Sequence, residues 1–120
     1  MAVTEGFVEW ISPGVAKMQW TATAVGIGNA HYVGGASNLT VQFDGMPAGT
    51  TSMRLDGSNT PARATEAGTF LPLTDPTGGT LLTLANLISE VQERPQWIQP
   101  NVTTATTATG ITCTVIATFR

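Results

Sequence analysis

The chain has 120 residues, a net charge of −3 and only 11% charged residues. Its five Lys and Arg residues are too few for direct binding of nucleic acid or of an anionic membrane surface, both of which need clustered cations. The length fits one domain with one core, and the lone cysteine, Cys113, excludes a disulfide within the chain.

Threonine is the most conspicuous residue, at 21 of 120 positions. Threonine favours pleated, half-buried strands, so this composition predicts a β protein. A charged fraction well below the usual quarter suits a surface that neighbouring molecules cover. The start, "MAVTEGFVEWISPG", lacks the basic and apolar regions of a secretion signal. Residues 95–119 are uncharged, but they alternate and contain Gln, Asn and Pro, so we do not expect a membrane span.

The first 25 residues predict two extended segments. Residues 1–16 are interpreted as an N-terminal arm or edge strand, ended by Ser-Pro-Gly at 12–14. From 17 to 25 the sequence alternates strictly, which predicts a strand with Met18, Trp20, Ala22 and Ala24 on its buried face. Residues 26–38, "GIGNAHYVGGASN", are expected to form a long, turn-rich loop.

The middle of the chain predicts short strands separated by turns. Residues 39–43 alternate with Leu39, Val41 and Phe43 inward, and Met53 and Leu55 belong to a second short strand. Asp56-Gly57 is interpreted as a tight turn, with Asn59 capping the following loop. Residues 69–74 return to the core through Phe70 and either Leu71 or Leu73, and "DPTGG" at 75–79 is the next turn.

The last third predicts three more extended segments. Residues 81–91 have some helical spacing, but strand followed by irregular chain is favoured. Two prolines place residues 95–103 at a sheet edge or a bulge. Residues 111–119 form the clearest strand, with Ile111, Cys113, Val115, Ala117 and Phe119 on one face. Together these segments predict an all-β fold: an antiparallel β-sandwich over residues 17–120, Ig-like or jelly-roll-like, with seven or eight short strands.

Candidate sites for chemistry are weak in this sequence. Asp56, Ser58 and Asn59 offer oxygens for a cation, but the spacing of a calcium loop is absent, so a turn is favoured. The single histidine, His31, has no metal-ligand or triad partner at a suitable spacing. We therefore expect no catalytic residues, no cofactor and no metal site.

The aromatic side chains carry more information. Trp20 lies on the apolar face of its strand and is expected in the core. Trp10, in the N-terminal segment, is the best candidate for docking against another subunit, since arms gain stability by burying aromatic residues elsewhere. Trp97 or Tyr32 would point to saccharide binding if either were exposed as a stacking platform.

Several motifs in residues 38–119 resemble small β-sandwich proteins of tailed bacteriophage virions. They are "NLTVQFDGMPAGTTSMRLDGSN", "FLPLTDPTGG", "ERPQWIQPNVT" and the closing Thr-rich strand. In that family a strand ends in a G-S-N-type turn, an aromatic-x-P-L strand follows, and an aromatic-Ile-x-Pro segment precedes the last strand. The chain departs from this pattern in its longer "TPARATEAG" insert and in its first 37 residues, so its position in the virion stays open.

The resemblance implies a non-enzymatic structural protein. Capsid decoration (cement) proteins, which bind the outer capsid surface and stabilise it, are the first expectation; a tail, neck or fibre protein, including a carbohydrate-binding one, is the alternative. The implied partners are the major capsid protein and further copies of this chain, for which a trimer is one option, and the implied location is the virion, after synthesis in the host cytoplasm. The expected contact residues are Phe7, Trp10, Ile11, Arg63, Glu66 and Trp97.

Overall fold

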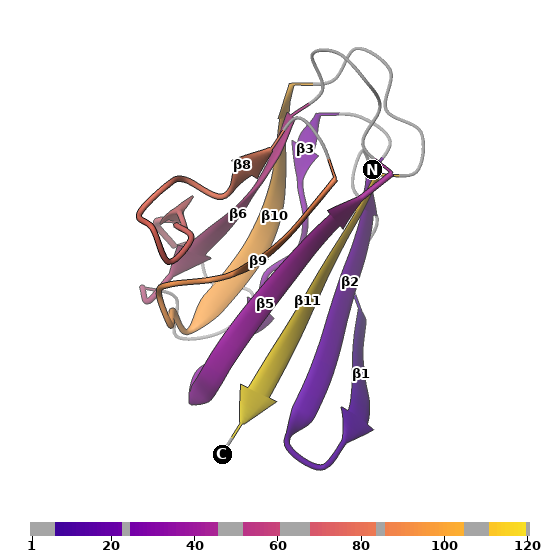
Figure 1. Ribbon diagram of the computed structural model, residues 1–120, viewed down its shortest axis with the longest axis vertical. Helices are drawn as coiled ribbons and strands as arrows, with labels where there is room; N and C mark the ends of the chain where they lie inside the picture. Colours follow the sequence, from indigo (N-terminus) through magenta and orange to yellow (C-terminus); the bar gives the residue numbers. More distant parts are fainter. Residues whose placement is uncertain are drawn as a thin grey trace.

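The computed structural model describes residues 7–22, 25–45, 52–60, 68–83, 86–104 and 111–119. These residues form strands and turns without a helix, and the strands build two antiparallel sheets around one core (Figure 1). The predicted all-β sandwich is therefore confirmed. Within these ranges, no helix is long and apolar enough to cross a membrane.

The first sheet has five strands with β11 at its centre, in the order β1-β2-β11-β5-β9. The strands are β1 (Phe7–Ser12), β2 (Val15–Ala22), β5 (Ala36–Asp44), β9 (Leu87–Glu90) and β11 (Ile111–Phe119). Strand β11 pairs with β2 on one side and with β5 on the other over most of its length. The last strand of the chain thus joins segments that lie far apart in the sequence.

Alternation of apolar and polar residues explains the three long strands of this sheet. In β2 the residues Ala16, Met18, Trp20 and Ala22 are buried, whereas Lys17, Gln19 and Thr21 are only partly covered. Strands β5 and β11 follow the same period of two, and their inward residues are those expected from the sequence. One face of the sheet therefore forms half of the core.

The second sheet consists of six strands around the neighbouring strands β10 and β6. Its members are β3 (Gly26–Ile27), β4 (His31–Tyr32), β6 (Ser52–Ser58), β7 (Leu71–Pro72), β8 (Leu82–Thr83) and β10 (Trp97–Thr104). Strands β3 and β4 both pair with β10, and β7 and β8 both pair with β6. Four of these strands have two residues each, which explains why the described ranges hold more strands than the sequence predicts.

The core lies between the two sheets and is almost entirely apolar. Its largest fully buried side chains include Trp20, Phe43 and Met18 from the first sheet and Met53 from the second. Cys113 is buried there as a free thiol, and burial raises the pKa of this thiol, so it packs as a small neutral group.

The prediction of a turn at Asp56-Gly57 is wrong. Both residues lie within β6, where Asp56 pairs with Gln99 and Gly57 pairs with Ile98. Asp56 is only 2% exposed, and its carboxylate accepts a hydrogen bond from Arg54 Nε at 2.8 Å. The ion pair with its neighbour on the same face lets this carboxylate lie inside a strand, where the sequence alone predicts a turn.

Packing, and not backbone conformation, requires glycine at position 57. The backbone of Gly57 is extended like that of any strand residue, so its φ does not call for glycine. A Cβ atom at this position would lie 2.7 Å from Leu73 Cδ2 and 2.7 Å from Pro95 Cγ. The glycine thus lets the segments that carry Leu73 and Pro95 approach the sheet closely.

We expect Gly57→Ala to lower the free energy of unfolding by about 1–3 kcal/mol, through overpacking. Urea denaturation measures the loss. In a Leu73→Ala background the clash with Leu73 is removed, so the same substitution should cost less, and the two changes should be coupled. Equal costs in both backgrounds would contradict this account of Gly57.

The expectation that the two prolines of residues 95–103 mark a sheet edge or a bulge is also wrong for Pro100. Pro100 lies in β10, which has strands on both sides, opposite Leu55 of β6. Its carbonyl accepts a hydrogen bond from Gly28 N at 2.9 Å, so its own nitrogen points to the same side, away from β6. Between β3 and β4 the chain leaves the sheet at residues 28–30, so the proline removes no hydrogen bond to a paired strand.

The remaining local predictions have mixed outcomes. The turn at 75–79 is confirmed: Asp75 Oδ1 accepts from Thr77 N at 2.9 Å and from Gly79 N at 3.0 Å, and Gly78 has a φ of 89°. Residues 26–38 contain β3, β4 and the start of β5 where a loop is expected. Residues 87–90 form β9 where irregular chain is expected. Of the two leucine alternatives, Leu73 is the buried one.

Candidate functional site

Among the described residues, the first sheet exposes three large apolar side chains along its edge strand β1. Val8, Trp10 and Ile11 are 46%, 62% and 55% exposed. The register places Val8 opposite Met18 and Trp10 opposite Ala16, both of which face the core. Val8 and Trp10 therefore belong to the inner face of the sheet, at an edge that the second sheet does not cover (Figure 1).

The ring of Trp10 rests on the end of the central strand. Its centroid lies 5.7 Å from that of Phe119, which packs against the core at the end of β11. The exposed tryptophan is thus supported on one side by a partly buried ring. We call Val8, Trp10, Ile11 and Phe119 the β1 patch.

The turn before β2 holds this edge in place. Gly14 has a φ of 79°, which suits glycine, and its carbonyl accepts a hydrogen bond from Phe119 N at 2.7 Å. A Cβ at Gly14 would lie only 2.7 Å from the carbonyl oxygen of Phe119. The hairpin of β1 and β2 is therefore tied to the same end of β11 that supports Trp10.

Strand β1 has few of the features that protect edge strands from pairing with other chains. Such strands usually carry charges, prolines or strong bulges. Within Phe7–Ser12 the charged residue is Glu9, the register shift near Ser12 comes at the very end, and three large apolar side chains are exposed. An unprotected apolar edge of this kind is suited to docking against another protein.

The predicted contact residues have different outcomes. Trp10 and Ile11 are consecutive, exposed residues of β1, and Phe7 begins the same strand. Arg63 and Glu66 lie outside the described residues. Trp97 is only 6% exposed, so it can offer a partner little surface. Val8 and Phe119 were not predicted; the alternation of β1 could have indicated Val8, but Phe119 joins the patch only through the pairing of strands.

The oxygens of the stretch considered for a cation bind other groups of the chain. The Asp56 carboxylate binds Arg54 and, through Oδ2, accepts from Asn101 Nδ2 at 3.3 Å. Asn59 Oδ1 accepts from Gln96 N at 2.8 Å. No cluster of three or more His, Cys, Asp or Glu side chains occurs among the residues with a described structure. His31 packs its ring against Trp20, with a centroid distance of 5.2 Å.

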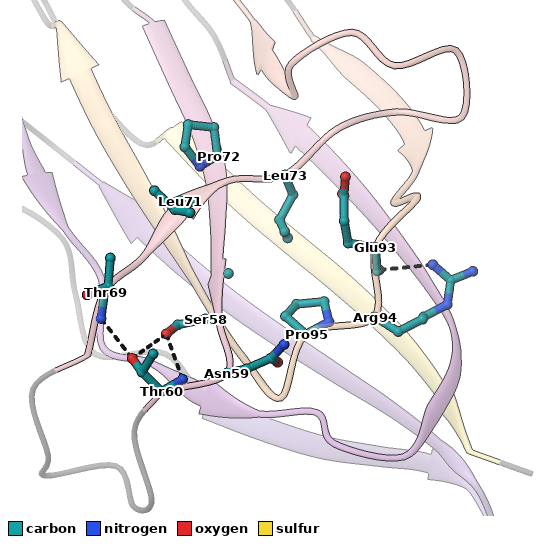
Figure 2. A pocket seen from close by; sticks show the side chains of 11 residues that line it. Ser58, Asn59, Thr60, Thr69, Leu71, Pro72, Leu73, Glu93, Arg94 and Pro95 are labelled. Carbon is teal, nitrogen blue, oxygen red and sulfur yellow. Dashed lines mark hydrogen bonds between the residues drawn. The ribbon is translucent and has the colours of Figure 1, made fainter.

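A pocket of about 410 Å³ lies beside the end of β6. Figure 2 shows Glu93, Arg94 and Pro95 on one side of it and Ser58 and Thr60 on the other. Further lining residues are Gly57, Asn59, Thr69, Leu71, Pro72 and Leu73. Its walls are thus apolar side chains and prolines, and its polar end is a pair of hydroxyls, Ser58 and Thr60, whose oxygens lie 2.9 Å apart.

The two charged residues of this pocket are engaged with the protein itself. Glu93 accepts hydrogen bonds from Thr74 N at 2.8 Å and from the Thr74 hydroxyl. Arg94 donates to the carbonyls of Val91, Gln92 and Glu93 and to that of Ser37. Both side chains therefore fix the course of residues 91–95.

The contact with Thr74 predicts a pH dependence of stability. Partial desolvation tends to raise the pKa of Glu93, but the hydrogen bonds from Thr74 outweigh it, so the pKa is lowered in the folded chain. A carboxyl whose pKa is lowered by folding stabilises the fold at every pH above its pKa in the unfolded chain, which is near 4.3. This contribution is lost as the pH falls through the pKa of the folded chain. Glu93→Gln should thus lower the Tm at pH 7 by a small amount, and the difference from the unchanged chain should shrink towards pH 3.

Thermal melts followed by circular dichroism from pH 7 to pH 3 measure this difference. In a Thr74→Val background the side-chain donor is gone, so the effect of Glu93→Gln should be smaller at every pH. A Tm difference that stays constant across the whole pH range would contradict the role given to Glu93.

Comparisons with known proteins support the fold. No family model matches the chain, and no curated protein matches its sequence. Among solved structures, the crystal structure of the SPBc2 prophage-derived protein YomS is similar, with a TM-score of 0.55 and 18% sequence identity. The match covers 91% of this chain and 98% of that one. The two chains therefore share a fold over nearly their whole lengths.

Proposed function

We propose that this chain is a non-enzymatic structural protein of a tailed-phage virion that binds the outer capsid surface and stabilises it. The observation that carries the proposal is the β1 patch, an apolar and unprotected sheet edge suited to a protein partner. The virion motifs of residues 38–119 support the phage setting, and so does the shared fold with a prophage-derived protein.

The physical role of such a protein is to add buried surface across the joints of a shell. A stable contact of about 1,200–2,000 Å² contributes binding without any chemistry. Many copies on one shell are held by several contacts at once, which strengthens each single contact. Low charge suits this role, because few charges must be desolvated when the surface is covered.

The proposed partners are the major capsid protein and neighbouring copies of this chain. The edge strand β1 can serve either contact, since an extended partner segment can pair with the side of β1 that no described strand occupies. The trimer at a local symmetry axis remains our proposal for the arrangement on the shell.

Particles made without the protein provide the test. Purified protein is mixed with these particles and sedimented with them, and heat resistance is followed by the release of packaged DNA. We expect saturable binding and DNA release at a higher temperature after binding. Absence of binding, together with unchanged heat resistance of particles lacking the gene, would overturn the proposal. Electron micrographs with labelled protein on the tail would overturn the capsid position alone.

A further inference from the structure

The six-stranded sheet presents an ordered set of polar and aromatic side chains on the face away from the core. In β10, Ile98 and Val102 belong to the core cluster, so Trp97, Gln99 and Asn101 lie on the opposite side. The register brings further residues beside them on the same side. We call this set the outer face: Tyr32, Arg54, Asp56, Ser58, Trp97, Gln99 and Asn101. Tyr32 is exposed and Arg54, Gln99 and Asn101 are partly exposed, whereas Asp56, Ser58 and Trp97 are buried.

An aromatic pair occupies one end of the outer face. Trp97 is buried, at 6% exposure, but it does not belong to the core cluster. The ring of Tyr32 meets it edge-on, with centroids 5.2 Å apart and an interplanar angle of 71°. A Cβ atom at Gly34 would lie 2.2 Å from the Tyr32 hydroxyl, so this ring also lies close over the backbone of Gly34. Tyr32 is thus held from two sides and is still 56% exposed.

Hydrogen-bonding groups without net charge occupy the other end. Arg54 and Asp56 form an ion pair at 2.8 Å, so their charges cancel. The Asn101 amide donates to the same carboxylate at 3.3 Å, and Gln99 lies opposite Asp56, between Asn101 and Trp97 along β10. The accessible part of the outer face therefore combines the exposed, fixed ring of Tyr32 with the partly exposed amides of Gln99 and Asn101 and the guanidinium of Arg54.

We propose that the outer face binds a neutral oligosaccharide. A sugar ring has an apolar C–H face that stacks on an aromatic ring, and its hydroxyls pair with planar amide and guanidinium groups. The cancelled charge of Arg54 and Asp56 offers little attraction to an anionic ligand, which favours a neutral one. This proposal goes beyond capsid binding and uses a different surface from the β1 patch.

The length of the face sets the size of the ligand. From the row of Tyr32 and Trp97 to the row of Arg54 and Asn101, strand β10 advances by four residues, from 97 to 101. This distance is about 13 Å at the usual rise of a strand. A single sugar ring on Tyr32 cannot reach the far row, whereas a chain of two or three sugars can.

Immobilised maltotriose, cellotriose and chitotriose, with sialyllactose as an anionic probe, test the proposal by biolayer interferometry. We expect at least one neutral trisaccharide to bind the unchanged chain. Tyr32→Ala should weaken this binding about tenfold or more, the size of one good contact, whereas Tyr32→Phe should keep most of it. Gln99→Ala should also weaken it, while its matched control Gln42→Ala, an exposed glutamine on the other sheet, should not.

The outcomes separate this proposal from the capsid role. Trp10→Ala should leave trisaccharide binding unchanged, and Tyr32→Ala should leave shell binding unchanged. The proposal is overturned if no neutral trisaccharide binds, if sialyllactose alone binds, or if a folded Tyr32→Ala chain binds as well as the unchanged one. Circular dichroism confirms the fold of each variant, and Gln99→Ala decides the matter if the Tyr32 variant does not fold.

Discussion

Trp20→Ala is expected to lower the free energy of unfolding by about 3–5 kcal/mol, which is a large part of the stability of a domain of this size. Trp20 is fully buried in β2, where it is one of the largest side chains of the core. Its removal would leave a cavity between the two sheets. Its indole Nε1 also donates to Asn29, at 2.9 Å to the carbonyl and 3.1 Å to the side-chain oxygen. Urea denaturation followed by far-UV circular dichroism measures the loss.

Two further variants separate packing from hydrogen bonding. Trp20→Phe retains much of the apolar volume but loses the donor to Asn29, so we expect a smaller loss of about 1–3 kcal/mol. Trp10→Ala is the matched control, because the same side chain is 62% exposed there and its truncation should be close to neutral for folding. Equal losses at Trp10 and Trp20 would contradict the burial described for them.

The long strands of the first sheet could be predicted from the sequence because one of their faces is buried and the other is not. Leu39, Val41 and Phe43 are buried as expected, and so are the inward residues of β11. The predicted starts of strands are less accurate: β2 begins at Val15 and β5 at Ala36, a few residues before the expected starts at 17 and 39. Alternation is weak at these ends, where Gly and small residues carry little pattern.

The central strands of the second sheet were harder to predict because contacts with residues far away in the sequence decide which residues they tolerate. Asp56 is tolerated inside β6 through its bond to Arg54, and Gly57 serves the close approach of Pro95. Pro100 is tolerated in β10 because its nitrogen faces the gap between β3 and β4. Sequence rules for turns and sheet edges therefore predict a turn or an edge at all three residues, because such rules carry no information on which strands pair.

The two candidate surfaces, the β1 patch and the outer face, also differ in how far the sequence could predict them. Trp10 and Ile11 could be chosen from the sequence as apolar residues in a segment before the main strands. For the outer face, Tyr32 and Trp97 could be named from the sequence as aromatic candidates for saccharide stacking. Their meeting could not be predicted, because they are far apart in the chain and come together through the pairing of β4 with β10. Surfaces built from one strand are visible in a sequence, whereas surfaces built across strands require the register.

Trp10→Ala is expected to weaken the binding of the protein to shells by about thirtyfold or more, with little change in stability. An exposed tryptophan fixed by a neighbouring ring is a typical centre of binding energy, and its truncation at such centres costs about 2 kcal/mol or more. Sedimentation of the protein with shells that lack it, over a range of concentrations, measures the change.

The opposite edge of the same sheet provides the matched control. Ile88 in β9 is 68% exposed, so Ile88→Ala removes an exposed apolar side chain like that of Ile11, at the other end of the strand order. If β1 is the docking edge, Ile88→Ala should bind shells nearly as well as the unchanged chain, whereas Ile11→Lys should bind poorly, because a charge would be buried at the contact. Loss of binding in Ile88→Ala with retention in Trp10→Ala would move the docking edge from β1 to β9. Retention in both would show that neither edge of the five-stranded sheet meets the capsid, and the contact would then have to lie on another surface.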